Sequence, residues 1–349
     1  MNNLRVLVFG AGAIGTYIGG SLALRGHTIT FQEIPRAAEY LRQNGIRLTM
    51  GSHTEAIRNV KITDSLQECL SQGELDLAIF ALKSYDTEAA LNQIRPYAAA
   101  FPPTLCLQNG VDNELRIGEV IGNDKVIAGS VTSALGKPGP GQVTLERLRG
   151  IGISNAHNLS ETIHNAFHDA KLNPQLFEKP IAMKWSKLLT NLLANASSAI
   201  LDLTPAQIFA HQELFQLEIM QLREALAILR AKNIPIVNLP GTPVRALAFA
   251  AQSLPRWLSQ PLLTRAVGGG RGAKMPSFHI DLRSGKGFSE VGWLNGAVVR
   301  AGLELGIHTP ANHILTDTLT RLLERQISME TYRHKPEALL AHLNFIKPT

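Results

Sequence analysis

The stretch VLVFGAGAIGTYIGG, residues 6–20, carries the strongest structural signal in this chain. It lies within an apolar run at strand spacing, residues 4–9, which is followed at once by Gly10, Gly12 and Gly15. Ile14 then continues the apolar pattern at helical spacing. The stretch therefore predicts a strand, a tight turn and a helix.

The segments after this stretch continue the alternation of strands and helices. A helix over residues 16–25 ends at Gly26, a suitable C-cap, and HTITFQE (27–33) predicts the second strand of a right-handed crossover unit. A further helix is expected after Asp86. Further strands are expected at residues 75–83, 104–110, 124–131 and 141–148. Such alternation is typical of a parallel sheet with helices on both faces.

The second half of the chain has a different character. From about Phe177 the apolar residues follow long helical patterns, at residues 183–201, at 213–234 and from Glu290 onward. Between them, the glycine-rich, basic stretch 265–287 is expected to be a surface loop near the cleft and not a regular helix. The prediction is an α/β protein with a Rossmann-type dinucleotide-binding domain, residues 1–177, and a mostly α-helical substrate-binding and catalytic domain, residues 178–349.

Composition argues against several classes of function. The net charge of +6 comes from dispersed basic residues, which favours small anionic ligands over nucleic acid, although a merely solvated basic surface explains it equally well. Cys69 and Cys106 lie far apart and the 11 histidines show no ligand spacing, so buried thiols and no metal site are expected.

No apolar stretch is long enough to span a membrane, and the first strand begins too early for a signal peptide, so a cytoplasmic protein is expected. The apolar helices could supply a homodimer surface, but a monomer fits equally well.

The three glycines predict a dinucleotide site. Gly10 permits the tight turn, Gly12 leaves room for the diphosphate near the backbone, and Gly15 lets the helix pack closely on the strand. The cofactor-binding residues expected in this turn are Gly10, Gly12, Ala13, Ile14 and Gly15. A glycine-rich turn without a ligand is the alternative.

Two side chains at the end of the second strand bear on which dinucleotide binds. Glu33 lies where a carboxylate can accept the adenosine ribose hydroxyls of NAD. Arg36, close by, could instead hold the 2′-phosphate of NADP, which a carboxylate facing it would repel. These two residues do not decide whether the cofactor is NAD(H) or NADP(H).

A polar stripe is expected on the helix predicted at residues 183–201. Lys187, Asn191 and Asn195 are spaced by four and would share one face of an otherwise apolar helix. Reduction of a ketone by hydride needs a proton for the developing alkoxide, which the Lys187 ammonium can donate while the two amides orient substrate oxygens. The alternative is a lysine that reaches solvent from a core helix, beside two structural amides.

With these residues in view, the chain resembles the ketopantoate reductase (2-dehydropantoate 2-reductase) family over nearly its whole length. That family reduces the 2-keto acid ketopantoate to pantoate, in the pathway to coenzyme A, with NADPH. The motifs that carry the resemblance are GAGAIG, ALKSYD, LQNG, KLLTNLLAN, KMPSFHIDL and SEVGWLNGAVV. Together they are much more specific than the glycine pattern. They imply the reduction of ketopantoate with NADP(H) as cofactor. The alternatives to this function are a reductase of another 2-keto acid and a non-catalytic dinucleotide-binding module.

The resemblance also implies roles for individual residues. Lys187 matches the catalytic lysine and Glu290 its acidic partner, although an acid in the first turn of a helix can also serve as a cap. The substrate-contacting positions are Asn191, Asn195 and Ser277, and the cofactor-side positions are Lys83 and Asn109. For Asn109, a purely structural turn is the alternative. Two departures are Ile34, where the family commonly has an arginine, and the glycine- and lysine-rich segment 284–287.

Overall fold

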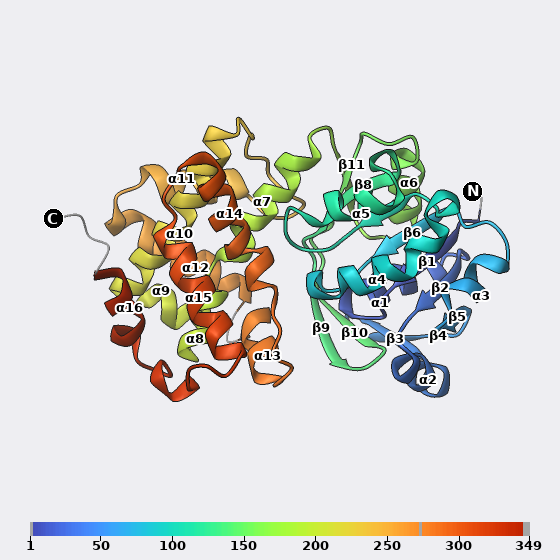
Figure 1. Ribbon diagram of the computed structural model, residues 1–349, viewed down its shortest axis with the longest axis horizontal. Coiled ribbons are helices and arrows are strands. Elements are labelled where there is room, and N and C mark those ends of the chain that lie inside the picture. Colours follow the sequence, from blue (N-terminus) through green and yellow to red (C-terminus); the bar gives the residue numbers. More distant parts are fainter. Residues whose placement is uncertain (1–2, 272–273, 345–349) are drawn as a thin grey trace. The chain divides into compact units, whose positions relative to one another are not determined.

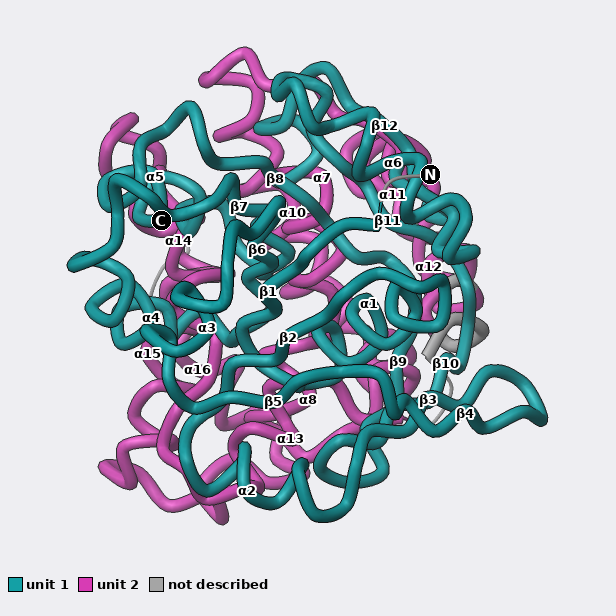
Figure 2. Tube along the Cα trace, turned by 90° about the vertical axis from the view of Figure 1, so that its right-hand side faces the viewer, with its two compact units in different colours: residues 1–184, 239–242 teal, residues 185–238, 243–349 magenta. Residues whose placement is uncertain are grey.

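The computed structural model describes residues 3–271 and 274–344. These residues form two compact units, residues 1–184 with 239–242 and residues 185–238 with 243–349 (Figure 2). The division falls inside one helix, α7 (Pro180–Leu192), whereas the sequence changes character near residue 177. The functional assignment of the two parts stays a prediction.

The first unit is built on an eight-stranded sheet in the order β12-β11-β8-β7-β6-β1-β2-β5 (Figure 1). Its strands are β1 (Arg5–Phe9), β2 (Thr28–Gln32), β5 (Val60–Thr63), β6 (Leu77–Phe80), β7 (Thr104–Cys106), β8 (Val126–Val131), β11 (Ile151–Ser154) and β12 (Pro174–Phe177). All neighbours from β5 to β8 pair in parallel, as predicted. The prediction of a parallel sheet is wrong at one edge, where β11 runs antiparallel to β8. β11 can reverse because it follows a hairpin excursion and not a crossover helix.

That excursion belongs to a second, four-stranded sheet, in the order β4-β3-β10-β9. Its strands are β3 (Ile46–Met50), β4 (His53–Ile57), β9 (Ala134–Gly139) and β10 (Gln142–Arg147). The strand expected at residues 141–148 is therefore present as β10, but it pairs with β3 and β9 and not with the main sheet.

Helices cover both faces of the main sheet, because successive side chains of its central strand point to opposite faces. Val6 and Val8 of β1 belong to one apolar core, and Leu7 and Phe9 belong to another. The helices of this unit are α1 (Ala13–Ala23), α2 (Pro35–Asn44), α3 (Leu66–Ser71), α4 (Thr87–Ile94), α5 (Asn113–Ile121) and α6 (Ser160–Asp169), with short 3-10 turns η1 (Ser84–Asp86), η2 (Arg95–Ala100) and η3 (Asn123–Lys125). α1 also contacts β3, β9 and β10 of the small sheet.

The second unit is helical, as predicted. Its helices after α7 are α8 (Ala196–Leu201), α9 (Pro205–Ala210), α10 (Gln212–Ala231), α11 (Val244–Ser253), α12 (Arg256–Arg271), α13 (Ser277–Arg283), α14 (Asn295–Leu305), α15 (Pro310–Leu323) and α16 (Pro336–Asn344), with 3-10 turns η4 (Glu290–Trp293) and η5 (Met329–Thr331). α10 contacts α9, α11, α14, α15 and α16. No helix within the described ranges is both long and apolar enough to cross a membrane.

Two expectations about this unit are wrong. The helix predicted over residues 183–201 is broken into α7 and α8, with Ala194 in the left-handed region at φ +47°. The stretch 265–287 contains regular helix, because α12 continues to Arg271 and α13 follows Pro276. Glycine lowers helix stability by about 1 kcal/mol per residue and does not forbid a helix. Residues 272–273 of that stretch lie outside the described residues.

Candidate active site

The glycine turn between β1 and α1 has the geometry of a phosphate cradle. Gly10 has φ +89°, a conformation that favours glycine, and its amide donates to Gln32 O at 3.1 Å. A Cβ on Gly15 would clash with the main-chain oxygen of Gly10, so only glycine lets α1 approach the turn this closely. A Cβ on Gly12, in contrast, would meet open space. Since Gly12 is the N-cap of α1 and no side chain caps that helix end, the turn fits the diphosphate of a dinucleotide.

The structure brings Glu33 to this turn. The residue follows β2, where its amide donates to Thr63 O at 2.9 Å, and its carboxylate Oε1 accepts a hydrogen bond from the Ala11 amide. Arg36 is exposed in the first turn of α2, and Ile34, its N-cap, is 66% exposed. Of the two candidate cofactor-selecting residues, Glu33 is therefore the one in contact with the glycine turn.

Lys83 and Asn109 lie in the loops that follow β6 and β7, the strands next to β1 on one side. The carboxyl ends of these parallel strands meet at one edge of the sheet, which places both loops on the same edge as the glycine turn. The two loops are also bonded to each other. Ser84 Oγ donates to Asn109 O at 3.1 Å, and Gln108 Nε2 donates to Leu82 O at 3.2 Å.

One residue of this edge was not predicted. Lys184, three positions before Lys187, is only 4% exposed, and its ammonium donates to Gln108 O at 2.6 Å and to Gly129 O at 3.2 Å. The ammonium also forms an ion pair with Glu114 Oε1 at 2.7 Å. Lys184 therefore holds the loop that carries Asn109. The signal in the sequence is a lysine at an otherwise apolar position of an amphipathic helix.

The cysteines of this unit are both buried, as expected. Burial, and next the nearby Glu114 carboxylate, raise the pKa of the Cys106 thiol, so this thiol stays protonated and unreactive. Among the residues that the structure describes, no group of His, Cys, Asp and Glu side chains is arranged to hold a metal ion.

In the second unit, the predicted polar stripe is divided between two helices. Lys187 and Asn191 lie four residues apart on α7, and both are partly exposed. Asn195, the N-cap of α8, remains beside them because its Nδ2 donates to Asn191 O at 3.1 Å. Its Oδ1 accepts from the Phe278 amide at 3.1 Å, and its Nδ2 lies 3.5 Å from Ser277 Oγ. The structure thus brings Asn191, Asn195 and Ser277 together from three segments.

The break between α7 and α8 is stabilised by a carboxylate from α10. Glu218 is fully buried; it accepts from the Ala194 amide at 2.7 Å and from Ser197 Oγ at 2.6 Å. Gln221, one turn later, donates to Leu192 O, near the end of α7, at 3.3 Å. Backbone groups that a continuous helix would pair internally are thus satisfied by side chains of another helix. This is the physical reason why the single helix predicted at 183–201 is not formed.

Gln221 also connects this break to the helix that follows Glu290. Asn295 Nδ2 donates to Gln221 Oε1 at 2.9 Å and to Asn312 Oδ1 at 3.0 Å. Asn312 Nδ2 in turn donates to the buried Glu224 at 2.7 Å. Burial raises the pKa of the Glu224 carboxyl, although hydrogen bonds from Asn312 and Ala311 oppose this. A buried polar network of five side chains, Glu218, Gln221, Glu224, Asn295 and Asn312, therefore holds α7, α8, α10, α14 and α15 in register.

Glu290 is the first residue of η4, before α14, and is only 1% exposed. Sequence alone could not separate a catalytic role from helix capping. In the structure the cap is a different residue, because Ser289 Oγ accepts from the Val291 amide at 3.2 Å. The side-chain cap is therefore Ser289, and Glu290 follows it as a buried acid in the first turn of η4.

Known proteins match this chain along both halves. The family model for ketopantoate reductase PanE/ApbA matches residues 6–158, and the model for its C-terminal part matches residues 181–323. The 2-dehydropantoate 2-reductase of Pyrococcus horikoshii is 29% identical over 232 residues, covering 64% of this chain and 73% of its own length. The enzyme of the same name from Streptococcus pyogenes is 24% identical over 322 residues, covering 89% and 95%.

Solved structures agree with these matches. A PanE/ApbA family ketopantoate reductase from Ralstonia eutropha superimposes with a TM-score of 0.78 at 26% identity, covering 93% of this chain and 99% of its own. A D-mandelate dehydrogenase solved with NADH and anilino(oxo)acetate shares the fold, with a TM-score of 0.76 at 19% identity, covering 92% and 99%. The sequence motifs, the two family models and the fold together show that this chain belongs to the ketopantoate reductase PanE/ApbA family.

Proposed function

We propose that the protein reduces a 2-keto acid to the 2-hydroxy acid with a nicotinamide dinucleotide, and that ketopantoate is its first candidate substrate. Its family and the names of its relatives support the reaction class. The observation that carries the proposal for this chain is the cluster of Asn191, Asn195 and Ser277. Asn191 lies one helical turn after Lys187 on α7, and Asn195 contacts both Asn191 and Ser277. Such groups recognise the carboxylate and hydroxyl oxygens of a small acid.

Each of these side chains has a role in the proposed reaction. When bound, the reduced dinucleotide supplies a hydride to the keto carbon, and the electron pair of the carbonyl bond moves to its oxygen. Lys187 donates a proton from Nζ to that oxygen and stabilises the charge as it develops. Asn191, Asn195 and Ser277 orient the substrate, and Glu290 is the acidic partner of Lys187 that the family resemblance implies.

The cofactor site belongs to the same proposal. The open space at Gly12 and the uncapped N-terminus of α1 fit a diphosphate, and Lys83 and Asn109 lie at the same sheet edge. The resemblance implies NADP(H), whereas Glu33, in contact with the glycine turn, favours ribose hydroxyls over a 2′-phosphate. We infer that NADH competes with NADPH in this chain because of Glu33.

One experiment tests the function directly. Purified protein is mixed with each of a panel of 2-keto acids, ketopantoate included, with NADPH and separately with NADH, and loss of absorbance of the reduced cofactor is followed. Turnover of ketopantoate above all other acids supports the proposal in full. Preference for another 2-keto acid would assign the chain to a different reductase. Cofactor binding without turnover of any acid would contradict catalysis and leave a dinucleotide-binding module.

Two further parts of the proposal concern the protein in the cell. A cytoplasmic location and a homodimer formed through the helical unit fit a reductase of this family, and neither depends on the residues of the site. Sedimentation of the purified protein measures its oligomeric state, and cell fractionation measures its location.

A further inference from the structure

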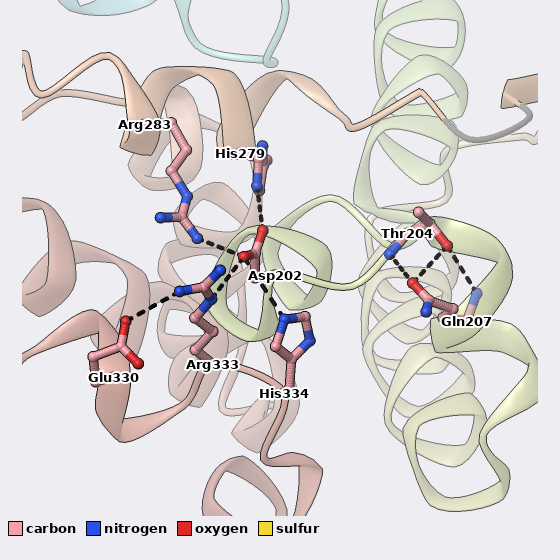
Figure 3. A network of polar contacts seen from close by, with 8 residues as sticks. All are labelled: Asp202, Thr204, Gln207, His279, Arg283, Glu330, Arg333 and His334. Atoms are coloured by element: carbon pink, nitrogen blue, oxygen red, sulfur yellow. Dashed lines mark hydrogen bonds and ion pairs between the residues drawn. The ribbon is translucent and has the colours of Figure 1, made fainter.

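Asp202, a residue to which no role has been assigned so far, is at the centre of a charged cluster on the helical unit. It is the C-cap of α8 and has left-handed backbone angles, φ +54° and ψ +39°. Its side chain is 19% exposed. Oδ1 lies 2.7 Å from His279 Nε2, and Oδ2 lies 2.7 Å from a terminal nitrogen of Arg283 (Figure 3).

A second segment reaches the same carboxylate from the opposite side. Arg333 Nε lies 3.1 Å and His334 Nε2 lies 4.0 Å from Asp202 Oδ2 (Figure 3). Arg333 is itself paired with Glu330 at 3.4 Å, and the His334 amide donates to Leu201 O at 2.8 Å. One carboxylate therefore joins the end of α8 to α13 and to the loop between η5 and α16.

The contacts of α13 show what this carboxylate holds. Both ends of α13 are attached to the two ends of α8: Asn195, the N-cap of α8, contacts Ser277 and Phe278, and Asp202, its C-cap, contacts His279 and Arg283. α13 has only seven residues, and Gly285 and Gly287 follow it with positive φ. Such a short helix is not stable by itself and depends on tertiary contacts for its position.

We propose that Asp202 is a positioning residue that holds α13, and with it the Ser277 hydroxyl, beside Asn195. The inference rests on the proposed role of Ser277 and Asn195 in holding the substrate. Ser277, His279 and Arg283 belong to one helix, so a contact made at His279 and Arg283 restrains Ser277 at the first position. Hydrogen bonds to a charged acceptor from two directions restrain the helix more strongly than a single neutral bond.

The first test uses Asp202→Asn, because asparagine keeps the shape of the side chain and tolerates left-handed backbone angles. Hydrogen–deuterium exchange is followed by mass spectrometry on peptides covering residues 274–288, in the whole protein without substrate. We expect faster exchange in these peptides and unchanged exchange in α10. Unchanged exchange at residues 274–288 would overturn the proposal.

A matched pair of variants distinguishes an effect on the position of α13 from an effect of removing any one positive charge from the cluster. Arg283→Gln and Arg333→Gln each remove one guanidinium from Asp202, and both arginines are partly exposed, 36% and 45%. Only Arg283 lies on α13. Arg283→Gln should raise exchange at residues 274–288 and Arg333→Gln should raise it much less. Equal effects of the two variants would overturn the proposal.

The last readout is kinetic. Asp202→Asn should raise KM for the keto acid about tenfold, the scale of one charged hydrogen bond, and change kcat by less than about threefold. Affinity for the reduced dinucleotide, measured by fluorescence titration, should not change. Faster exchange with an unchanged KM would refute the role in substrate binding. If the wild-type protein reduces no keto acid, the proposed function fails, and the exchange experiments still decide whether Asp202 holds α13.

Discussion

Lys184 donates a hydrogen bond from inside the first unit to the main-chain oxygen of Gln108, across 2.6 Å. Gln108 immediately precedes Asn109, so this buried ammonium determines the position of a loop at the predicted cofactor edge. Lys184 is only 4% exposed, and burying an unpaired ammonium group is energetically costly. The ion pair with Glu114 compensates for this cost.

Lys184→Met should therefore impair both stability and cofactor binding. Methionine fills similar space but cannot donate, and it leaves the Glu114 carboxylate without this partner. We expect a loss of roughly 1–3 kcal/mol in the free energy of unfolding. Urea unfolding measures this loss, and titration with reduced dinucleotide should show weaker binding. The control is Lys179→Met, at an exposed position five residues earlier and just before α7; equal stability of the two variants would contradict the role of Lys184.

The glycine turn offers two substitutions with opposite expected effects. Gly12→Val should abolish dinucleotide binding and lower the melting temperature only slightly, because its Cβ meets open space in the protein and any residue can adopt φ −72°, although valine is a weaker N-cap than glycine. Gly15→Ala should instead lower the melting temperature, because its Cβ clashes with Gly10 O. Thermal unfolding and dinucleotide titration of both variants check this. Undiminished binding in Gly12→Val would remove the cofactor assignment.

We expect the choice between NADH and NADPH to depend on Glu33 and Arg36. Glu33→Ala should weaken NADH relative to NADPH, because it removes the acceptor for the ribose hydroxyls without adding a phosphate ligand. Arg36→Ala should have the reverse effect only if a 2′-phosphate binds there. The ratio of the two dissociation constants is the measurement. A ratio unchanged in both variants would mean that neither side chain contacts the adenosine ribose.

Lys187 should be required for turnover and not for cofactor binding. Lys187→Ala should lower kcat by about 10² to 10⁴, the usual scale of general acid catalysis. Lys187→Arg keeps the positive charge but releases its proton much less readily, so kcat should stay low while KM is largely preserved. Steady-state rates at saturating cofactor and varied keto acid concentration measure kcat and KM of both variants. A Lys187→Ala enzyme as fast as the wild type would exclude the proposed proton donor.

The Asp202 cluster predicts a pH dependence of stability. Partial burial raises the pKa of the Asp202 carboxyl, but the hydrogen bond from His279 and the charges of Arg283, His279 and Arg333 together hold it below its ordinary value. A folded pKa below the unfolded value of about 3.9 gives stability that is present above that pH and is lost as pH falls through the folded pKa.

Asp202→Asn cannot titrate and serves as the reference. The difference in free energy of unfolding between wild type and Asp202→Asn should be full at neutral pH and should shrink as the pH is lowered below about 4. Urea titrations across this range measure it. A difference that is constant with pH would show that the carboxylate charge does not stabilise the fold.

Much of the first unit could be predicted because the signals are local. Alternating apolar residues define β1, and the glycine spacing defines a turn that only residues without a Cβ can form, as at Gly10 and Gly15. In the helical unit, the spacing of four predicts that Asn191 and Asn195 lie side by side, and only the family resemblance adds Ser277 to them; the three residues do lie together. The sequence motifs along the chain are therefore sufficient to indicate the family.

Other features depend on partners far away in the sequence. The break at Ala194 exists because Glu218, on another helix, accepts a hydrogen bond from the Ala194 amide. In a continuous helix this amide would have bonded to a carbonyl of the same helix. The pairing of β10 with β3, the reversal of β11 and the burial of Lys184 are likewise contacts between distant segments. The strand, turn and helix at the glycine motif could be read from the residues alone, because periodicity and glycine spacing act over a few residues. Only the tertiary structure decided where helices break, which strands pair and which charges are buried, because those outcomes depend on hydrogen bonds that no neighbouring residue can make.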